Sequence, residues 1–165
     1  MAKTLPECRA RQQAPAQGDK GTSIRLEHAN LSVRDVEGTI RFLTRACPEL
    51  RVRGRGPDCA GLRWGHLGTD ESYLSLLEAT GEAAEPFVPY TGRPGLNHLG
   101  FEVPDAAAVR ARLLAAGYRE TSVANAHPHR TRVYFADAEG NDWEFVEYHS
   151  RIPSERNDYL LPDLE

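Results

Sequence analysis

Hydrophobic and polar residues follow the same pattern twice along the chain. Residues 25–46 read RLEHANLSVRDVEGTIRFLTRA and residues 95–116 read GLNHLGFEVPDAAAVRARLLAA, and they align without a gap. Each copy begins with alternating apolar residues, which predict a half-buried strand, and continues with a helical period. Asp35 and Asp105 stand at equivalent strand–helix junctions, where an aspartate is suited to cap the helix. Gly117 occupies the place expected of a glycine that ends the second helix.

Three strand-like runs follow each predicted helix. They are Leu50–Arg55, Gly61–Leu67 and Ser72–Glu78 in the first half, and Tyr118–Val123, Thr131–Ala136 and Asp142–Tyr148 in the second. The predicted order is therefore β-α-β-β-β, repeated once in tandem. Such a repeat predicts an α+β fold built from two similar units.

The chain divides into one domain with a polar segment at each end. Residues 1–22 are rich in polar residues, Ala, Pro and Gly, and we expect them to be disordered. Prolines and glycines mark a linker at 80–94. The expected division is a single domain at 23–150 with units at 24–79 and 95–148, followed by a C-terminal arm at 151–165.

Composition excludes several classes of function. A formal net charge of −4 argues against a nucleic-acid partner, because nucleic-acid binders usually carry a basic face. The three cysteines, Cys8, Cys47 and Cys59, show no CxxC spacing, which favours reduced thiols in a cytosolic protein. The chain has neither the apolar core of a signal peptide nor a segment as long as a membrane span. We therefore expect a cytoplasmic protein without a membrane partner.

The doubled unit resembles the vicinal oxygen chelate superfamily over residues 24–148. This superfamily includes glyoxalase I, extradiol ring-cleaving dioxygenases, fosfomycin-resistance transferases and bleomycin-resistance proteins. The resemblance implies that the two units form a cupped, barrel-like mixed sheet around a metal site and a small-molecule substrate. It also implies a homodimer, since members commonly cover exposed sheet edges by dimerisation. In some relatives one site draws ligands from two chains.

Three residues fall on the metal-ligand positions of that superfamily. His28 and His98 occupy the same place in the two first strands, and Glu144 follows a DAEGN turn that resembles the family's Asp-Pro-x-Gly-Asn turn. Two neutral imidazoles and one carboxylate form a facial triad suited to Fe(II) and workable for Mn(II). A single strand histidine is more often structural, so the matched pair carries the argument. Glu147 is the alternative carboxylate, but strand alternation puts it on the opposite face from Glu144.

The segment 125–144, NAHPHRTRVYFADAEGNDWE, resembles the signature of extradiol dioxygenases. It departs from that signature at Ala138, where a proline is expected. The resemblance implies that His127, with His129 as a nearby substitute, shuttles protons and that Tyr134 hydrogen-bonds a substrate oxygen. The alternative interpretation is that both histidines are solvated in a polar loop and that Tyr134 only fills the barrel.

The last strand of the first unit distinguishes between reactions. Aligning YLSLLEA with DWEFVEY puts Ser75 opposite Glu144, where glyoxalase I-like enzymes carry a carboxylate. A serine cannot act as the mobile base that isomerisation needs. The predicted function is therefore an Fe(II) extradiol-type dioxygenase acting on a small vicinal-oxygen aromatic. The alternatives are a glyoxalase I-like lyase, a Mn(II) fosfomycin-type thiol transferase, and a ligand-binding protein like those of bleomycin resistance.

Overall fold

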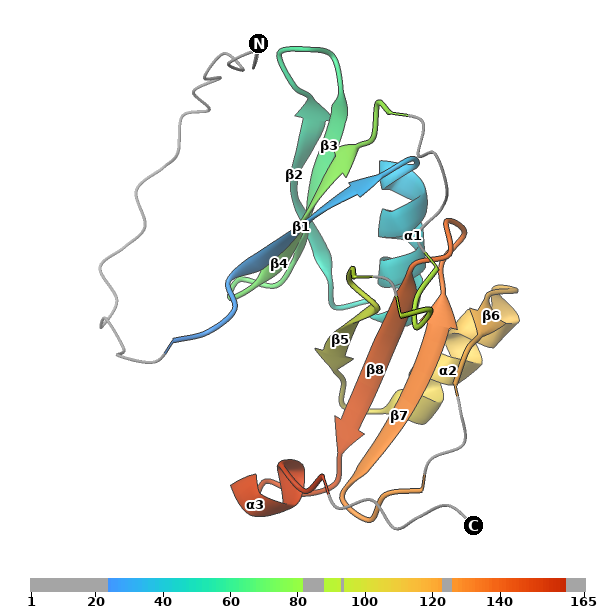
Figure 1. Cartoon of the computed structure of the whole chain (residues 1–165). Coiled ribbons are helices and arrows are strands. Elements are labelled where there is room, and N and C mark those ends of the chain that lie inside the picture. Colours follow the sequence, from blue (N-terminus) through green and yellow to red (C-terminus); the bar gives the residue numbers. More distant parts are fainter. Residues whose placement is uncertain (1–23, 82–87, 93, 123–125, 160–165) are drawn as a thin grey trace.

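The computed structural model describes residues 24–81, 88–92, 94–122 and 126–159, so the segment expected to be disordered at 1–22 lies outside the described residues. Two β-α-β-β-β units follow one another (Figure 1). The first contains β1 (His28–Val33), α1 (Val36–Ala46), β2 (Arg51–Pro57), β3 (Arg63–Gly68) and β4 (Tyr73–Glu78). The second contains β5 (His98–Glu102), α2 (Ala106–Ala115), β6 (Arg119–Glu120), β7 (Arg130–Ala136) and β8 (Asp142–Tyr148), followed by a short α3 (Pro153–Arg156). The predicted α+β class and doubled unit are confirmed.

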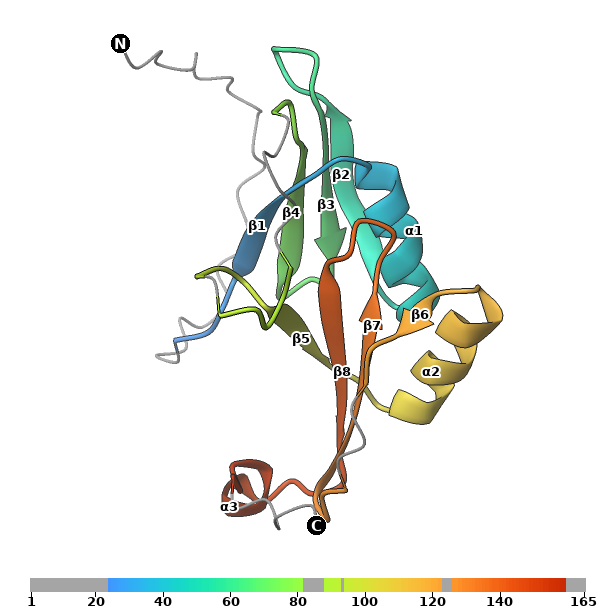
Figure 2. The same cartoon turned by 45° about the vertical axis from the view of Figure 1, so that its right-hand side comes forward.

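Each unit forms one four-stranded mixed sheet. The strand orders are β1-β4-β3-β2 and β5-β8-β7-β6, so the first strand of each unit lies beside its last strand. These first and last strands pair in parallel, and the remaining pairs are antiparallel. The register is equivalent in the two units, because His28 pairs with Tyr73 and His98 pairs with Asp142. Each sheet is cupped, and the two sheets do not close into a continuous barrel (Figure 2).

The helix ends follow from the residues that the repeat singles out. Asp35 and Asp105 each accept a hydrogen bond from the backbone amide three residues further along, at 2.8 Å in both helices. Gly117 follows α2 with a φ of 81°, a left-handed conformation that glycine adopts without a steric cost. Both expected N-caps and the expected C-terminal glycine are therefore confirmed.

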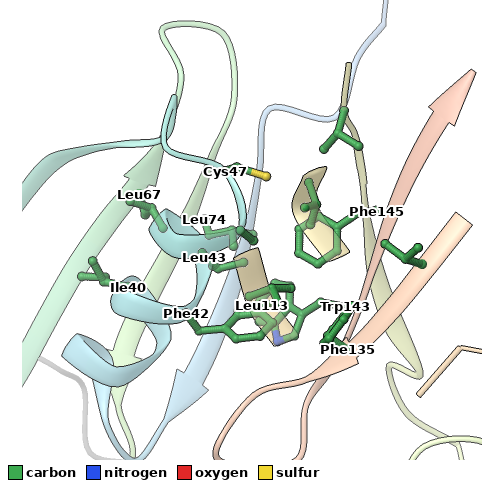
Figure 3. Close-up of a cluster of buried hydrophobic side chains, with 14 of the residues drawn as sticks. Ile40, Phe42, Leu43, Cys47, Leu67, Leu74, Leu113, Phe135, Trp143 and Phe145 are labelled. Carbon is green, nitrogen blue, oxygen red and sulfur yellow. The ribbon is translucent and has the colours of Figure 1, made fainter. Parts of the chain in front are cut away.

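One apolar cluster joins the two units between the helices and the sheets (Figure 3). The ring of Phe42, on α1, lies 4.8 Å from that of Tyr118 and 6.1 Å from that of Trp143, measured between centroids. The α1 and α2 helices contact each other, and Arg112 of α2 donates to the carbonyl of Ala46 at the end of α1. This packing leaves the opposite face of each sheet, which bears the predicted ligands, uncovered by α1 and α2.

The strand expected at Tyr118–Val123 is shorter in the structure and consists of β6 alone. The side chain of Ser122 accepts the backbone N–H of Tyr134 at 2.7 Å and so replaces the next ladder hydrogen bond. Val123 lies outside the described residues.

The beginning of the expected C-terminal arm is attached to the second sheet. Arg156 stacks on the ring of Tyr148, with 3.8 Å from the guanidinium carbon to the ring centroid. It also forms two hydrogen bonds with the carboxylate of Glu102, at 2.6 and 3.1 Å. No helix within the described parts of the chain is long and apolar enough to span a membrane.

Candidate metal centre

His98 and Glu144 converge on the open face of the second sheet. His98 begins β5 and Glu144 lies in the neighbouring strand β8, which places the Nε2 atom of His98 3.2 Å from the Oε2 atom of Glu144. The carboxylate is mostly buried, with 14% of its side chain exposed. Gly100, directly across from Glu144, leaves the necessary space, because a Cβ there would lie 3.2 Å from that same Oε2 atom. The strand pairing therefore brings together one imidazole and one carboxylate.

A hydrogen-bond chain behind His98 determines which ring nitrogen carries the proton. The hydroxyl of Tyr90 donates to Oδ2 of the buried Asp142 at 3.0 Å, and its oxygen lies 2.8 Å from Nδ1 of His98. Thr121 also donates to Asp142, at 2.5 Å. Because the phenol O–H donates its hydrogen bond to the carboxylate, the phenol oxygen accepts a hydrogen bond from the Nδ1–H group of His98. The Nε2 atom then faces Glu144, and a cation bound between this nitrogen and Oε2 would be coordinated by both atoms.

Tyr90 is held in an unusual backbone conformation. Its φ is 63°, and a bulky residue in this left-handed region costs on the order of 1 kcal/mol. The backbone N–H of Tyr90 donates to Oδ1 of Asn97 at 2.8 Å, which helps to hold the loop in place. Burial of the phenol raises the pKa of Tyr90 to about 12, and the hydrogen bond with Asp142 acts in the same direction. The phenol therefore remains a proton donor at neutral pH.

Tyr134 contacts the other oxygen of the Glu144 carboxylate. The two residues face each other across the β7–β8 pair, and the Tyr134 hydroxyl donates to Oε1 at 2.6 Å. Burial and this hydrogen bond both raise the pKa of Tyr134 above its ordinary value. Nε of Arg132 lies 4.0 Å from the same Oε1 atom. Tyr134 thus engages Oε1 and leaves Oε2 directed at His98.

Glu147 and Ser75 occupy the places that strand alternation and the repeat predict. Glu147 points to the opposite face of β8, where its Oε2 atom accepts the backbone N–H of Ala106 at the start of α2, at 3.0 Å. Ser75 pairs with Asn30 in the first unit as Glu144 pairs with Gly100 in the second. The hydroxyl of Ser75 accepts a hydrogen bond from the Asn30 side chain at 3.0 Å. No carboxylate stands at this position of the first unit.

A cavity of about 470 Å³ opens beside these residues. Its lining includes His98, Tyr134 and Asp142, together with the cationic side chains of Arg119 and Arg132. This volume lies within the range of sites for small molecules. The arrangement therefore combines a metal-ligating pair, oriented by a hydrogen-bond chain, with space for a small substrate.

A model of the Glyoxalase/Bleomycin resistance protein/Dioxygenase superfamily matches residues 25–145. The chain belongs to this superfamily. Its structural neighbours lie in the same vicinal oxygen chelate superfamily, which confirms the resemblance found in the repeat. No curated protein sequence matches the chain.

Solved structures of this superfamily resemble the chain over most of its length. A glyoxylase/bleomycin resistance protein/dioxygenase domain from Frankia sp. EAN1pec is 24% identical, with a TM-score of 0.62, over 77% of this chain and 99% of that one. A glyoxalase family protein from Bacillus cereus is 16% identical, with a TM-score of 0.64, over 78% and 97%. A mutant of the fosfomycin resistance protein FosX from Listeria monocytogenes was solved with Mn(II) and 1S,2S-dihydroxypropylphosphonic acid. It is 15% identical, with a TM-score of 0.57, over 81% and 98%. These similarities show the fold.

The remaining predicted ligand of the superfamily site, His28, lies apart from His98 and Glu144 within one chain. It belongs to the first sheet, where its ring stacks on Tyr73 with centroids 4.9 Å apart and its Nδ1 atom contacts the carboxylate of Glu27. In the described part of the chain, no three or more His, Cys, Asp or Glu side chains are grouped closely enough to hold a metal ion. One chain thus brings together two of the three predicted ligands.

The histidines of the segment that resembles the superfamily's dioxygenases lie toward the other end of β7. Tyr134, in the second half of β7, pairs with Glu144. His127 and His129 precede Arg130, which is the first residue of the strand. The buried ring of His127 accepts the backbone N–H of His129 at Nδ1, at 3.1 Å. Neither histidine lines the cavity beside His98. The catalytic roles predicted for these two residues stay predictions.

Sequence reasoning did not identify Tyr90, Thr121 or Asp142 as parts of the site. A signal existed for Asp142, a carboxylate two positions before Glu144 and hence on the same face of one strand. Tyr90 lies in the irregular linker, where no periodicity indicates which way a side chain points. Thr121 falls within the strand expected at Tyr118–Val123, of which only β6 forms.

Proposed function

We propose that the chain binds a divalent metal ion through His98 and Glu144 and acts as a metal-dependent enzyme on a small substrate with two adjacent oxygens. The observation that carries this proposal is the approach of Nε2 and Oε2 to 3.2 Å at the edge of a cavity. One nitrogen and one carboxylate oxygen suit Fe(II) and Mn(II), with Fe(II) favoured. When bound, the metal supplies a Lewis acid that polarises a substrate oxygen.

We further propose that His28 of the partner subunit completes the ligand set in a homodimer. His28 is half-exposed, with 45% of its side chain accessible, on the helix-free face of the first sheet. The equivalent face of the second sheet carries His98 and Glu144. A two-fold pairing of first and second units would therefore supply two imidazoles and one carboxylate to each of two sites.

The reaction that we propose for this site is extradiol-type oxygenation of a small aromatic with Fe(II). Tyr134 holds Oε1 of Glu144, and the Tyr90–Asp142 pair engages Nδ1 of His98, so that Nε2 is the ring nitrogen directed at Glu144. Ser75 offers no mobile carboxylate base, which argues against an isomerisation of the glyoxalase I type. His127 and His129 are predicted to move protons, a role that requires them to reach the substrate.

Two matched carboxylate variants test the metal proposal. We expect Glu144→Ala to remove nearly all bound Fe(II) or Mn(II), because it deletes an anionic ligand. Glu147→Ala should retain the metal, because Glu147 lies on the opposite face and caps α2. The measurement is metal content by mass spectrometry after purification without chelators, with circular dichroism as the folding control. Equal metal content in both variants would contradict the proposal.

The reaction is tested by oxygen uptake of the Fe(II)-loaded protein with a panel of catechols. Tyr134→Phe and His127→Ala should both reduce the uptake. Mn(II)-dependent addition of a thiol to fosfomycin, or isomerisation of the methylglyoxal–glutathione adduct, would instead identify one of the alternative reactions. Binding of an aromatic ligand without bound metal or turnover would identify a protein of the bleomycin-resistance type.

A further inference from the structure

Arg130 is a buried cation on the same face of the second sheet as Glu144. The residue is 7% exposed, and its Nη1 atom donates to the backbone carbonyl of Arg156 at 3.2 Å. The Nε atom has no hydrogen-bond partner among the described residues. Nor does any described carboxylate form an ion pair with Arg130, whereas Arg110 is paired with Glu120. A buried guanidinium without an anion is unfavourable, which points to a ligand that supplies one.

Arg130 faces a hollow of about 260 Å³ next to the candidate metal centre. Glu144 forms part of its wall, and Arg132 lines both this hollow and the larger cavity beside His98. A substrate held at His98 and Glu144 can therefore extend toward Arg130. The complete lining is Arg130, Arg132, Glu144, Val146, Tyr148 and Tyr159.

The chemistry of this lining selects an anionic group with an apolar or aromatic neighbour. Guanidinium groups present planar forks of N–H donors that match the oxygens of a carboxylate or phosphonate. The Arg130 guanidinium carbon lies 5.8 Å from the centroid of the Tyr159 ring, and Tyr148 and Val146 add aromatic and aliphatic surface. The negative charge of Glu144 repels an anionic ligand. A cation bound to the Glu144 carboxylate would neutralise this charge and remove the repulsion.

We propose that this hollow is a subsite for an oxyanion group, a carboxylate or a phosphonate, carried by the substrate. Arg130 is its principal donor and Arg132 its second. The assignment to a substrate rests on the proposed function, while the subsite itself is formed without a metal.

Anion titrations of the full-length, metal-free protein test this subsite. Benzoate and methylphosphonate are the probes, and isothermal titration calorimetry at low ionic strength measures their dissociation constants. We expect Arg130→Gln to weaken binding of at least one probe by about tenfold or more, because it removes charge-assisted hydrogen bonds. Arg132→Gln should weaken it to a smaller extent. The matched control is Arg110→Gln, on the exposed side of α2, which should leave the affinity unchanged.

Glu144→Gln provides a second measurement that a purely structural role of Arg130 would not change. Removing the negative charge beside the subsite should tighten binding of the same probe in metal-free protein. No saturable binding of either probe to the wild-type chain, or equal affinities of the wild type and Arg130→Gln, would overturn the proposal. His98→Ala separates the two proposals, because it should abolish metal binding and retain anion binding.

Discussion

At the scale of single residues, the candidate centre depends on the buried carboxylate of Asp142, which is not one of the proposed metal ligands. Asp142 accepts hydrogen bonds from Tyr90 and Thr121, which belong to the linker and to the segment after β6. Through Tyr90 it assigns the proton of His98 to Nδ1. Residues of this kind orient metal-binding histidines, and their loss commonly weakens metal affinity without removing a ligand.

Tyr90→Phe tests this orientation directly. The substitution retains the ring and removes the oxygen that accepts the Nδ1 proton of His98, so we expect metal affinity to fall by about tenfold. Competition with a chromophoric chelator measures the affinity, and ¹⁵N chemical shifts of the His98 ring report its tautomer in metal-free protein. Tyr118→Phe is the control, because the Tyr118 ring packs on Phe42 away from the centre. An unchanged tautomer and affinity in Tyr90→Phe would refute this role.

At the scale of elements, the turn between β7 and β8 connects the two units. Asp137 organises the turn by accepting the amides of Glu139 and Asn141 and the indole N–H of Trp143. The carboxylate of Glu139 then accepts the backbone amides of Arg34 and Asp35, at 2.9 and 2.7 Å. The turn that precedes Glu144 is thus attached to the start of α1 in the other unit.

We expect Glu139→Ala to lower the free energy of unfolding by about 1 kcal/mol. It removes two hydrogen bonds to a carboxylate, whose contribution is reduced by partial exposure to solvent. Urea denaturation followed by Trp fluorescence provides the measurement. Glu71→Ala, an exposed glutamate in the turn between β3 and β4, should change stability by less than about 0.5 kcal/mol. Equal stability of the two variants would show that the turn does not couple the units.

At the scale of the whole molecule, each unit presents a sheet face that α1 and α2 do not cover, and the two faces carry different groups. The face of the first sheet bears a row of rings in which Tyr73 lies between His28 and His66, with Trp64 beyond. These side chains are partly exposed in the single chain. The face of the second sheet bears the candidate metal centre. Superfamily members often dimerise, and we propose that dimerisation joins these two faces.

Mixing two inactive variants tests the two-chain site. We expect sedimentation at micromolar concentration to show a homodimer, and both His28→Ala and Glu144→Ala to lose metal. After the two variants are unfolded together and refolded, heterodimers regain one intact site, so about a quarter of wild-type metal binding should return. The control is the same procedure applied to each variant alone. A monomeric mass, or no recovery on mixing, would contradict the proposed arrangement.

The sequence by itself determined the elements of this protein and the direction of several site residues. Hydrophobic periodicity is a local property, so the doubled β-α-β-β-β order and the capping positions Asp35, Asp105 and Gly117 could be predicted from neighbouring residues. Strand alternation likewise separated Glu144 from Glu147. The repeat identified Ser75 as the counterpart of Glu144.

Only the tertiary structure decided how these elements meet. Tyr90 reaches His98 through a left-handed turn of the linker, and an irregular segment has no period from which that contact could be predicted. His28 shares its repeat position with His98 but lies on a separate sheet, and the two units meet where α1 packs against α2. His127 is close to Tyr134 in sequence, yet an extended strand carries each residue about 3.3 Å further along the sheet. His127 and Tyr134 are therefore close in sequence but lie apart along the strand.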